Sequence, residues 1–147
     1  MKKGIQRVAM VAHDNRKAAL IAWARTHRER LSGCRLVTTG TTGRLLAEHA
    51  GLQVEALQSG PLGGDQQIGA RIAEGDIDLL IFFWDPLESM SHDPDIKALL
   101  RIATVWNVPI ACTESAADLV IASAVFDTYE RQVPDFSDYQ RRRVMSV

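Results

Sequence analysis

Short apolar runs alternate with amphipathic stretches along most of this 147-residue chain, and this alternation constrains the fold more than any other feature. Five runs are typical of strands: residues 7–13, 34–40, 52–58, 78–84 and 109–113. Between and after them the pattern predicts helices over residues 15–30, 42–50, 64–74, 95–107 and 115–122. Strands that alternate with helices predict an α/β fold, a doubly wound, mostly parallel five-stranded sheet with helices on both faces.

The length of the chain favours one domain. A chain of 147 residues buries enough surface to form a full core, and no low-complexity segment or long-period repeat divides it. We therefore expect a single domain over residues 1–147, in which residues 133–147 form a divergent C-terminal tail. The tail is polar, mixed in charge and rich in arginine near its end, which is typical of a solvated terminus.

Charge and cysteine content narrow the class of protein. Seventeen Lys and Arg residues nearly balance eighteen Asp and Glu residues, which argues against a general nucleic-acid binder. Cys34 and Cys112 show no CxxC or Cys/His metal spacing, so we expect reduced thiols in a reducing cytosol. The apolar runs at residues 8–12 and 79–84 are too short for a signal peptide or a membrane span. We expect a cytoplasmic protein that binds neither nucleic acid nor membrane.

The polar clusters of interest all follow predicted strands. They are His13-Asp14, TTGTTG at residues 38–43, SGPLGGDQQ at residues 59–67 and DPLESMSHDPD at residues 85–95. In open parallel sheets, ligands bind beyond the carboxyl ends of the strands, where loops lead into helices. The sequence therefore predicts one site at this edge of the sheet.

Two of these loops are suited to binding an anion. TTGTTG and SGPLGG are rich in Thr, Ser and Gly and each precedes a predicted helix, whose amino terminus attracts negative charge. The structural alternative for TTGTTG is a capped turn in which Gly40 supplies an unusual backbone angle. Neither loop matches a known nucleotide-binding pattern. Together they are suited to one phosphoryl group, with Lys17 as a cation, although Lys17 alone has the simpler reading of a surface lysine.

The histidine and aspartate pairs have several interpretations. Asp14 is a natural cap for the helix that follows it, and Asp85 is either a turn former or a group that orients a neighbour. His92 has no comparable structural role, and histidine is well suited to hydrogen-bond a carbonyl and to move protons near neutral pH. A metal site is the less favoured alternative, because no HxxxH or HxH spacing joins His13 to His92.

Asp65 is a carboxylate next to a predicted phosphate loop. Two unit charges 4 Å apart repel by roughly 4 kcal/mol at an effective dielectric near 20, so a role in chemistry explains Asp65 better than folding does. Such repulsion makes a carboxylate a stronger base. A base beside a phosphate favours proton abstraction from a carbon of a small phosphorylated carbonyl compound, with a histidine donor for the enediolate oxygen.

Residues 7–18, 38–43, 59–69 and 76–109 closely resemble the methylglyoxal synthase family, and the strings GGDQQ and FFWDPL…HDPD are specific to it. The resemblance implies a carbon–oxygen lyase that converts dihydroxyacetone phosphate to methylglyoxal and inorganic phosphate. The steps it implies are proton abstraction, enediolate formation and phosphate elimination, with no cofactor and no metal. It also implies a homohexamer and, in many members, inhibition by phosphate.

The resemblance also implies roles for individual carboxylates and histidines. Asp65 looks like the catalytic base and His92 like the residue that hydrogen-bonds the substrate oxygens. Asp14 and Asp95 resemble carboxylates that assist in the site, and Asp85 resembles one that orients the base or the histidine.

Further residues resemble the family's substrate contacts. His13 matches a substrate-binding histidine, and the phosphate cradle is matched by Lys17, Thr39, Thr41, Thr42, Ser59 and Gly60. An arginine near the carboxyl terminus is expected to reach a neighbouring subunit's site; Arg143 is our assignment, with Arg141 and Arg142 as alternatives.

Two other functions remain as alternatives. Similar folds serve as regulatory modules in larger enzymes such as carbamoyl phosphate synthetases, and such a module would need no catalytic carboxylate. A metal-dependent phosphohydrolase that uses the His-Asp pairs is the second alternative. The presence of Asp65 and of the HDPD string in this chain favours the lyase.

Overall fold

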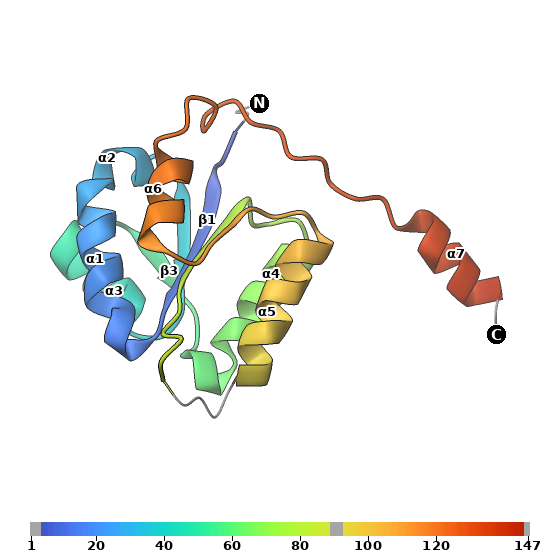
Figure 1. Ribbon diagram of the computed structural model, residues 1–147, viewed down its shortest axis with the longest axis horizontal. Helices are drawn as coiled ribbons and strands as arrows, with labels where there is room; N and C mark the ends of the chain where they lie inside the picture. The colour runs from blue at the N-terminus through green and yellow to red at the C-terminus, as the bar shows by residue number, and fades with distance from the viewer. Residues whose placement is uncertain (1–3, 89–92, 146–147) are drawn as a thin grey trace.

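The computed structural model describes residues 4–88 and 93–145 and has an all-parallel sheet at its centre (Figure 1). Five strands pair in the order β3-β2-β1-β4-β5. Their bounds are β1 Arg7–Ala12, β2 Arg35–Thr38, β3 Val54–Ala56, β4 Leu79–Phe83 and β5 Ile110–Ala111. Each predicted run contains one of these strands, and the predicted α/β class is confirmed.

Helices cover both faces of the sheet, as predicted. Figure 1 shows α1, α2, α3 and α6 on one side and α4 and α5 on the other. The helices are α1 Lys17–Thr26, α2 Arg28–Leu31, α3 Thr42–Ala50, α4 Gly64–Ala73, α5 Asp93–Val105, α6 Glu114–Ile121 and α7 Ser137–Met145, with short 3-10 turns η1 Asp14–Arg16 and η2 Gly60–Leu62.

Alternate side chains of the central strands point to opposite faces of the sheet, where they belong to two separate apolar layers. On β1, Val8 and Met10 pack towards α1, α3 and α6, whereas Ala9 and Val11 pack towards α4 and α5. All residues of β4 are buried, as follows for a strand in the interior of a sheet that has helices on both faces. The paired strands are thus held rigidly, and the loops at their ends are positioned by a packed core.

The helix predicted over residues 15–30 is divided. It begins as η1, continues as α1 and α2, and breaks at His27, whose backbone angles (φ −106°, ψ 21°) are not helical. There the His27 Nε2 atom lies 3.3 Å from Asp118 Oδ1, which also accepts a hydrogen bond from Trp23 Nε1 at 2.9 Å. Contacts to α6, distant in sequence, thus accompany the break.

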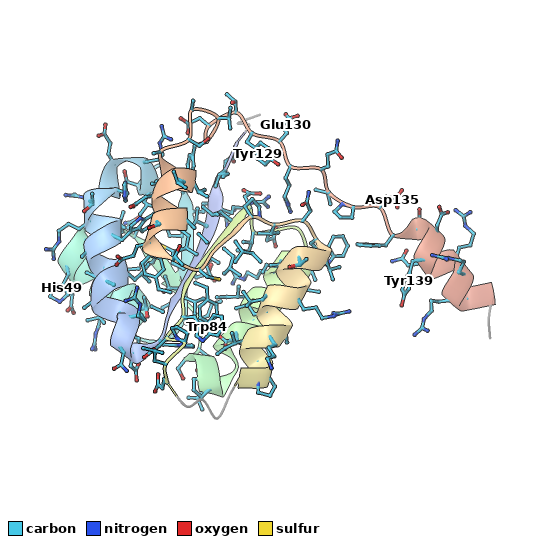
Figure 2. The ribbon with its side chains drawn as sticks, viewed as in Figure 1. His49, Trp84, Tyr129, Glu130, Asp135 and Tyr139 are labelled. Carbon is cyan, nitrogen blue, oxygen red and sulfur yellow. The ribbon has the colours of Figure 1, made fainter. Side chains whose placement is uncertain are left out.

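The C-terminal residues form an arm that leaves the body and ends in α7, which the sequence pattern did not predict (Figures 1 and 2). Figure 2 shows Tyr129 and Glu130 where the arm departs and Tyr139 on the distant helix. The arm is held near its start because Asn107 Nδ2 donates to the Gln132 carbonyl at 2.9 Å and Trp106 meets Phe136 edge-on at 5.1 Å. The described part of α7 is exposed along its length.

Asp78 fixes the amino end of β1. Its Oδ2 atom accepts hydrogen bonds from the backbone N–H groups of Gln6 and Arg7. The Arg7 guanidinium donates to the other carboxylate oxygen, Oδ1, at 2.9 Å. Burial acts to raise the pKa of Asp78, but the hydrogen bonds from Arg7 and from the backbone outweigh it, and the pKa lies below its ordinary value of 3.8.

We expect Asp78→Asn to lower the free energy of unfolding at neutral pH by about 2 kcal/mol, the usual contribution of hydrogen bonds to a charged group. Because the folded-state pKa is lowered, the stabilisation is present above the ordinary value of 3.8 and is lost as the pH falls through the folded-state value. Urea unfolding at several pH values measures the difference. Asp76→Asn, which removes an exposed partner 3.4 Å from Arg7, should cost less; an equal cost, or a pH-independent one, would contradict this account.

Within residues 4–88 and 93–145, no helix combines the length and the apolar character needed to cross a membrane.

Candidate active site

A cavity of about 580 Å³ opens at the carboxyl edge of the sheet, where the sequence predicts a site. Its lining comes mainly from the end of β1, from the segments after β1, β2 and β3 and from the first turn of α4, with Glu88 contributed from beyond β4. Several predicted residues meet there: His13, Asp14, Lys17, Thr39, Thr41, Ser59, Gly60 and Asp65. The positions of these side chains follow from parallel strands that all end at one edge.

The two predicted anion loops pack directly on each other. Gly40 has a left-handed backbone (φ 56°), as its alternative role as a turn residue required, and its N–H donates to the Gln58 carbonyl at 3.1 Å. A side chain at Gly40 would bring its Cβ within 3.2 Å of the Ser59 Cα atom. Because the two loops approach so closely, they line one side of the cavity together, with Thr39 from the first loop and Gly60 from the second.

Gly64 is the first residue of α4 and allows the start of this helix to approach Gln58 and Thr39 closely. A Cβ atom at Gly64 would collide with the Gln58 carbonyl oxygen and would lie 2.8 Å from Thr39 Cγ2. The helix is also tied to the loop because the Gln67 Oε1 atom accepts a hydrogen bond from the Gln58 N–H at 2.9 Å. The position of α4 relative to the cavity therefore depends on a residue without a side chain.

Asp65 is the second residue of α4 and lies in the cavity wall, with 3 % of its surface exposed. Its carboxylate is beside the backbone of Gly60, where an added Cβ atom would be 3.4 Å from Oδ1. A buried carboxylate next to a glycine-rich loop is the arrangement expected from the sequence for a base.

Lys17 brings a positive charge to the same cavity. Its Nζ atom lies 2.8 Å from Asp14 Oδ1 and 3.4 Å from Thr41 Oγ1. The hydrogen bond and charge of Lys17 lower the pKa of Asp14. The expected cap role of Asp14 is wrong, because Asp14 is the first residue of η1 and its carboxylate accepts a hydrogen bond from the Lys17 ammonium group.

His13 lies at the end of β1 with 8 % of its surface exposed and its ring edge-on to Phe82. The backbone N–H of Asp85 donates to His13 Nδ1 at 3.0 Å. The Asp85 carboxylate in turn accepts hydrogen bonds from Asn15 Nδ2 at 3.1 Å and from the Leu87 N–H at 3.0 Å. These hydrogen bonds, Asn15 first, lower the pKa of Asp85. Asp85 does not line the cavity and lies behind His13.

Three other predicted residues also lie away from the cavity lining. Thr42 is fully buried as the first residue of α3. Asp95 is near the start of α5, where its Oδ1 atom accepts a hydrogen bond from Gln66 Nε2 at 2.8 Å. Arg143 is on α7, over the ring of Tyr139 and remote from this cavity (Figure 1). His92 falls outside the described residues, so its role stays a prediction.

Several residues that sequence reasoning missed belong to this region. Gln58, Pro61 and Glu88 line the cavity, and Asn15 joins the loop after β1 to the loop after β4. Asn15 directly follows the His-Asp pair, which is the only sequence signal that points to it. By contrast, Figure 2 shows His49 on the outer side of α3, away from the cavity.

A second cavity, of about 540 Å³, lies at the opposite, amino edge of the sheet. Its charged groups are largely paired with one another: Arg71 binds Glu55 at 2.7 Å and Arg7 approaches Asp76 at 3.4 Å. Parallel sheets do not bind ligands at this edge as a rule, so the carboxyl-edge cavity is the candidate site. In the part of the chain that the structure describes, no group of three or more His, Cys, Asp or Glu side chains is arranged to hold a metal.

Comparisons with known proteins agree on one family. A family model described as MGS-like domain matches residues 19–112. The methylglyoxal synthase of Hahella chejuensis is 58% identical over 142 residues, covering 97% of this chain and 93% of that protein. The one from Cellvibrio japonicus is 56% identical and covers 92% and 89%. The crystal structure of methylglyoxal synthase from Elizabethkingia anophelis superposes with a TM-score of 0.88 at 44% identity, covering 96% of this chain and 93% of that one.

Proposed function

This chain belongs to the methylglyoxal synthase family, and on that premise we propose that its carboxyl-edge cavity converts dihydroxyacetone phosphate to methylglyoxal and inorganic phosphate. The enzyme is a carbon–oxygen lyase. The observation that carries the assignment of the site is the buried Asp65 carboxylate in a cavity that also holds Lys17 and the Ser59–Gly60 loop. A base and a phosphate cradle within one cavity are what this reaction requires.

Asp65 acts as the base in this proposal. It removes a proton from the hydroxymethyl carbon, and the electron pair of that C–H bond forms the enediolate, whose charge rests on the former carbonyl oxygen. The hydroxyl proton on the hydroxymethyl oxygen then moves to the former carbonyl oxygen, the electron pair of the C=C bond shifts towards the phosphate-bearing carbon, and the C–O bond to phosphate breaks. The enol aldehyde that remains takes up a proton on its terminal carbon and becomes methylglyoxal. Low exposure of Asp65 supports the role, because a carboxylate withheld from water is a stronger base.

The phosphate cradle consists of Lys17, the Thr39–Thr41 loop and the Ser59–Gly60 loop, with Thr42 contributing through the start of α3. Lys17 supplies the positive charge, and the loops supply hydroxyl and N–H donors near two helix amino termini. His13 and His92 donate to the substrate oxygens. Asp14 assists next to Lys17 and Asp95 assists from the start of α5, where their carboxylates accept hydrogen bonds from Lys17 and Gln66. Asp85 orients His13 through its backbone N–H, which donates to the ring.

The cradle also selects between two fates of the enediolate. Phosphate leaves readily when its C–O bond is perpendicular to the enediolate plane, because the orbitals then overlap; an isomerase must hold that bond in the plane. Two loops packed against each other can fix this torsion more firmly than one. We therefore expect the contact between Gly40 and Ser59 to favour elimination.

The direct test is to incubate the pure protein with dihydroxyacetone phosphate and to follow methylglyoxal and inorganic phosphate together. We expect both to appear at equal rates, and at unchanged rates in the presence of a chelator. Phosphate release without methylglyoxal, or activity lost with the chelator, would favour the metal-dependent phosphohydrolase. Binding of dihydroxyacetone phosphate without turnover would favour the regulatory module.

Lys17→Ala should raise the KM for dihydroxyacetone phosphate and the Ki for inorganic phosphate by roughly 10- to 100-fold. This range corresponds to the loss of a hydrogen bond between charged groups. Steady-state kinetics with phosphate as a competitor measure both constants. Lys97→Ala, which alters an exposed lysine outside the cavity lining, is the matched control. Unchanged phosphate affinity in Lys17→Ala would mean that the cradle lies elsewhere.

The arm supports a shared site in a homohexamer, with phosphate as an inhibitor as well as a product. The described residues of α7 include an arginine run at 141–143 that lies away from the cavity of its own chain (Figure 1), and Arg143 is the one we assign to a neighbouring subunit's site. Sedimentation equilibrium tests the hexamer. A chain that ends before Gln140 should lose activity, and full activity would exclude the arginines.

Cellular location belongs to the same proposal. Both cysteines lie within the described residues and neither forms a disulfide. Reduced thiols are usual in the cytoplasm, where we expect the enzyme to act.

A further inference from the structure

One ring nitrogen of His13 is committed to the protein backbone. The Nδ1 atom lies 3.0 Å from the backbone nitrogen of Asp85, and a backbone N–H can only donate. A ring nitrogen that accepts a hydrogen bond carries no proton, and in a neutral imidazole the proton is then on the other nitrogen. This contact selects the tautomer in which Nε2 is the donor of the ring.

The same contact disfavours a charged ring. An imidazolium carries hydrogen on both nitrogens, so its Nδ1–H would point directly at the Asp85 N–H. The carboxylates of Asp14 and Asp85 act in the opposite direction, but Lys17 pairs with Asp14 at 2.8 Å. The ring is also buried against Phe82, where a charge is more costly than in water.

Asn15 holds the turn that presents this backbone N–H. The Leu87 N–H donates to Asp85 Oδ1 and closes a local turn after β4. The Asn15 amide donates to Asp85 Oδ2 and so ties this turn to η1, which directly follows His13. The loops after β1 and β4 are thereby held in fixed positions on either side of the His13 imidazole.

We propose that Asn15 and Asp85 are positioning residues: Asn15 holds the Asp85 turn, and the Asp85 N–H keeps His13 as a neutral Nε2–H donor to the carbonyl oxygen of the substrate. The identity of that substrate rests on the proposed function. When Asp65 takes the carbon-bound proton, the electron pair moves to the carbonyl oxygen, and Nε2–H stabilises it without giving up its own proton. Electron density therefore stays in the enediolate. Once the hydroxyl proton of the first carbon has moved to this oxygen, the negative charge lies on the other oxygen, from which it can expel phosphate.

The test observes the ring directly and then the reaction. In the ¹⁵N-labelled full-length protein without ligand at neutral pH, the His13 signals are identified by their loss in His13→Gln. We expect Nδ1 in the range of an unprotonated nitrogen and Nε2 in the range of a protonated one. Asn15→Ala should shift His13 towards a mixture of tautomers and lower kcat by roughly 10- to 100-fold, with little change in KM. Gln53→Ala, which removes an exposed amide at the opposite edge of the sheet, should change neither.

The outcomes separate the two proposals. A protonated Nδ1 in the parent protein would overturn the inference, and so would an Asn15→Ala variant that loses kcat while its His13 signals stay the same. If the parent protein made no methylglyoxal, the proposed function would fail, while the spectra would still decide the tautomer. Asn15 is exposed on a short turn, so its replacement should leave the fold intact, and a circular dichroism melt checks this.

Discussion

Asp65→Asn is expected to slow the release of phosphate from dihydroxyacetone phosphate by roughly 10²- to 10⁴-fold, the contribution of a positioned general base. The substitution keeps the size and shape of a side chain that is 3 % exposed, so the fold should persist. It removes the only property that the reaction needs from this position, the ability to accept a proton from carbon. Coupled detection of methylglyoxal measures the rate, and Asp76→Asn at the amino edge of the sheet should leave it unchanged.

The same variant gives a second, opposite result that identifies the role of the carboxylate. Removal of a negative charge beside the cradle reduces repulsion, so inorganic phosphate should bind at least as tightly as in the parent protein. Calorimetric titration with phosphate measures this. A slow variant that also binds phosphate more weakly would show that Asp65 shapes the cradle and is not its base, and near-normal turnover would remove Asp65 from the chemistry altogether.

Gly64→Ala is expected to reduce kcat/KM by roughly 100-fold, which is the effect of a displacement of about 1 Å at a reacting group. The new methyl group would collide with the Gln58 carbonyl oxygen and press against Thr39, so the start of α4 must move. Asp65 is the next residue and moves with it. The same crowding should cost about 1–3 kcal/mol of unfolding free energy, measured by urea denaturation.

Gly69→Ala is the matched control on the same helix. A Cβ atom at Gly69 would lie 3.7 Å from Ile102 Cγ2, an ordinary contact, and alanine in a helix interior is favoured over glycine by about 0.5–1 kcal/mol. We expect this variant to be at least as stable as the parent chain and fully active. Equal losses in both glycine variants would show that α4 tolerates no added volume anywhere, and the loss in Gly64→Ala could then not be assigned to the contacts with Gln58 and Thr39.

Much of the fold could be predicted from the sequence because it depends on local pattern. The continuous apolar run of β4 and the alternation of strands with helices are visible in a single chain, and parallel strands place their loops at one edge. The break at His27 could not be predicted, because it involves Asp118, 91 residues away in sequence. The helix α7 also escaped prediction, because its polar sequence has no apolar stripe.

The candidate site shows the same division. The loops were found because their composition is unusual, but Thr42 and Asp95 proved to lie outside the cavity lining. Asp14 was expected to cap a helix, whereas Lys17 binds its carboxylate. Asn15 was missed because its amide joins two loops, and no sequence motif or residue spacing predicts a contact of that kind. Side-chain partners across the sheet edge depend on distances between separate loops, and those distances are absent from a linear pattern.

The ion pair between Lys17 and Asp14 has a consequence for how the catalytic cycle ends. In the proposed mechanism, the product is inorganic phosphate, and the cradle binds the same group as an ester while the substrate is present. A lysine without a neighbouring negative charge would hold this product more tightly. Asp14 is exposed and only 2.8 Å from Lys17 Nζ. The Lys17 ammonium group can therefore pair with Asp14 again as phosphate leaves. Because Lys17 exchanges one negative partner for another, we expect the free energy to change little when the substrate binds and when phosphate leaves. Phosphate release then need not limit turnover, even where the cradle holds the phosphoryl group firmly during the reaction.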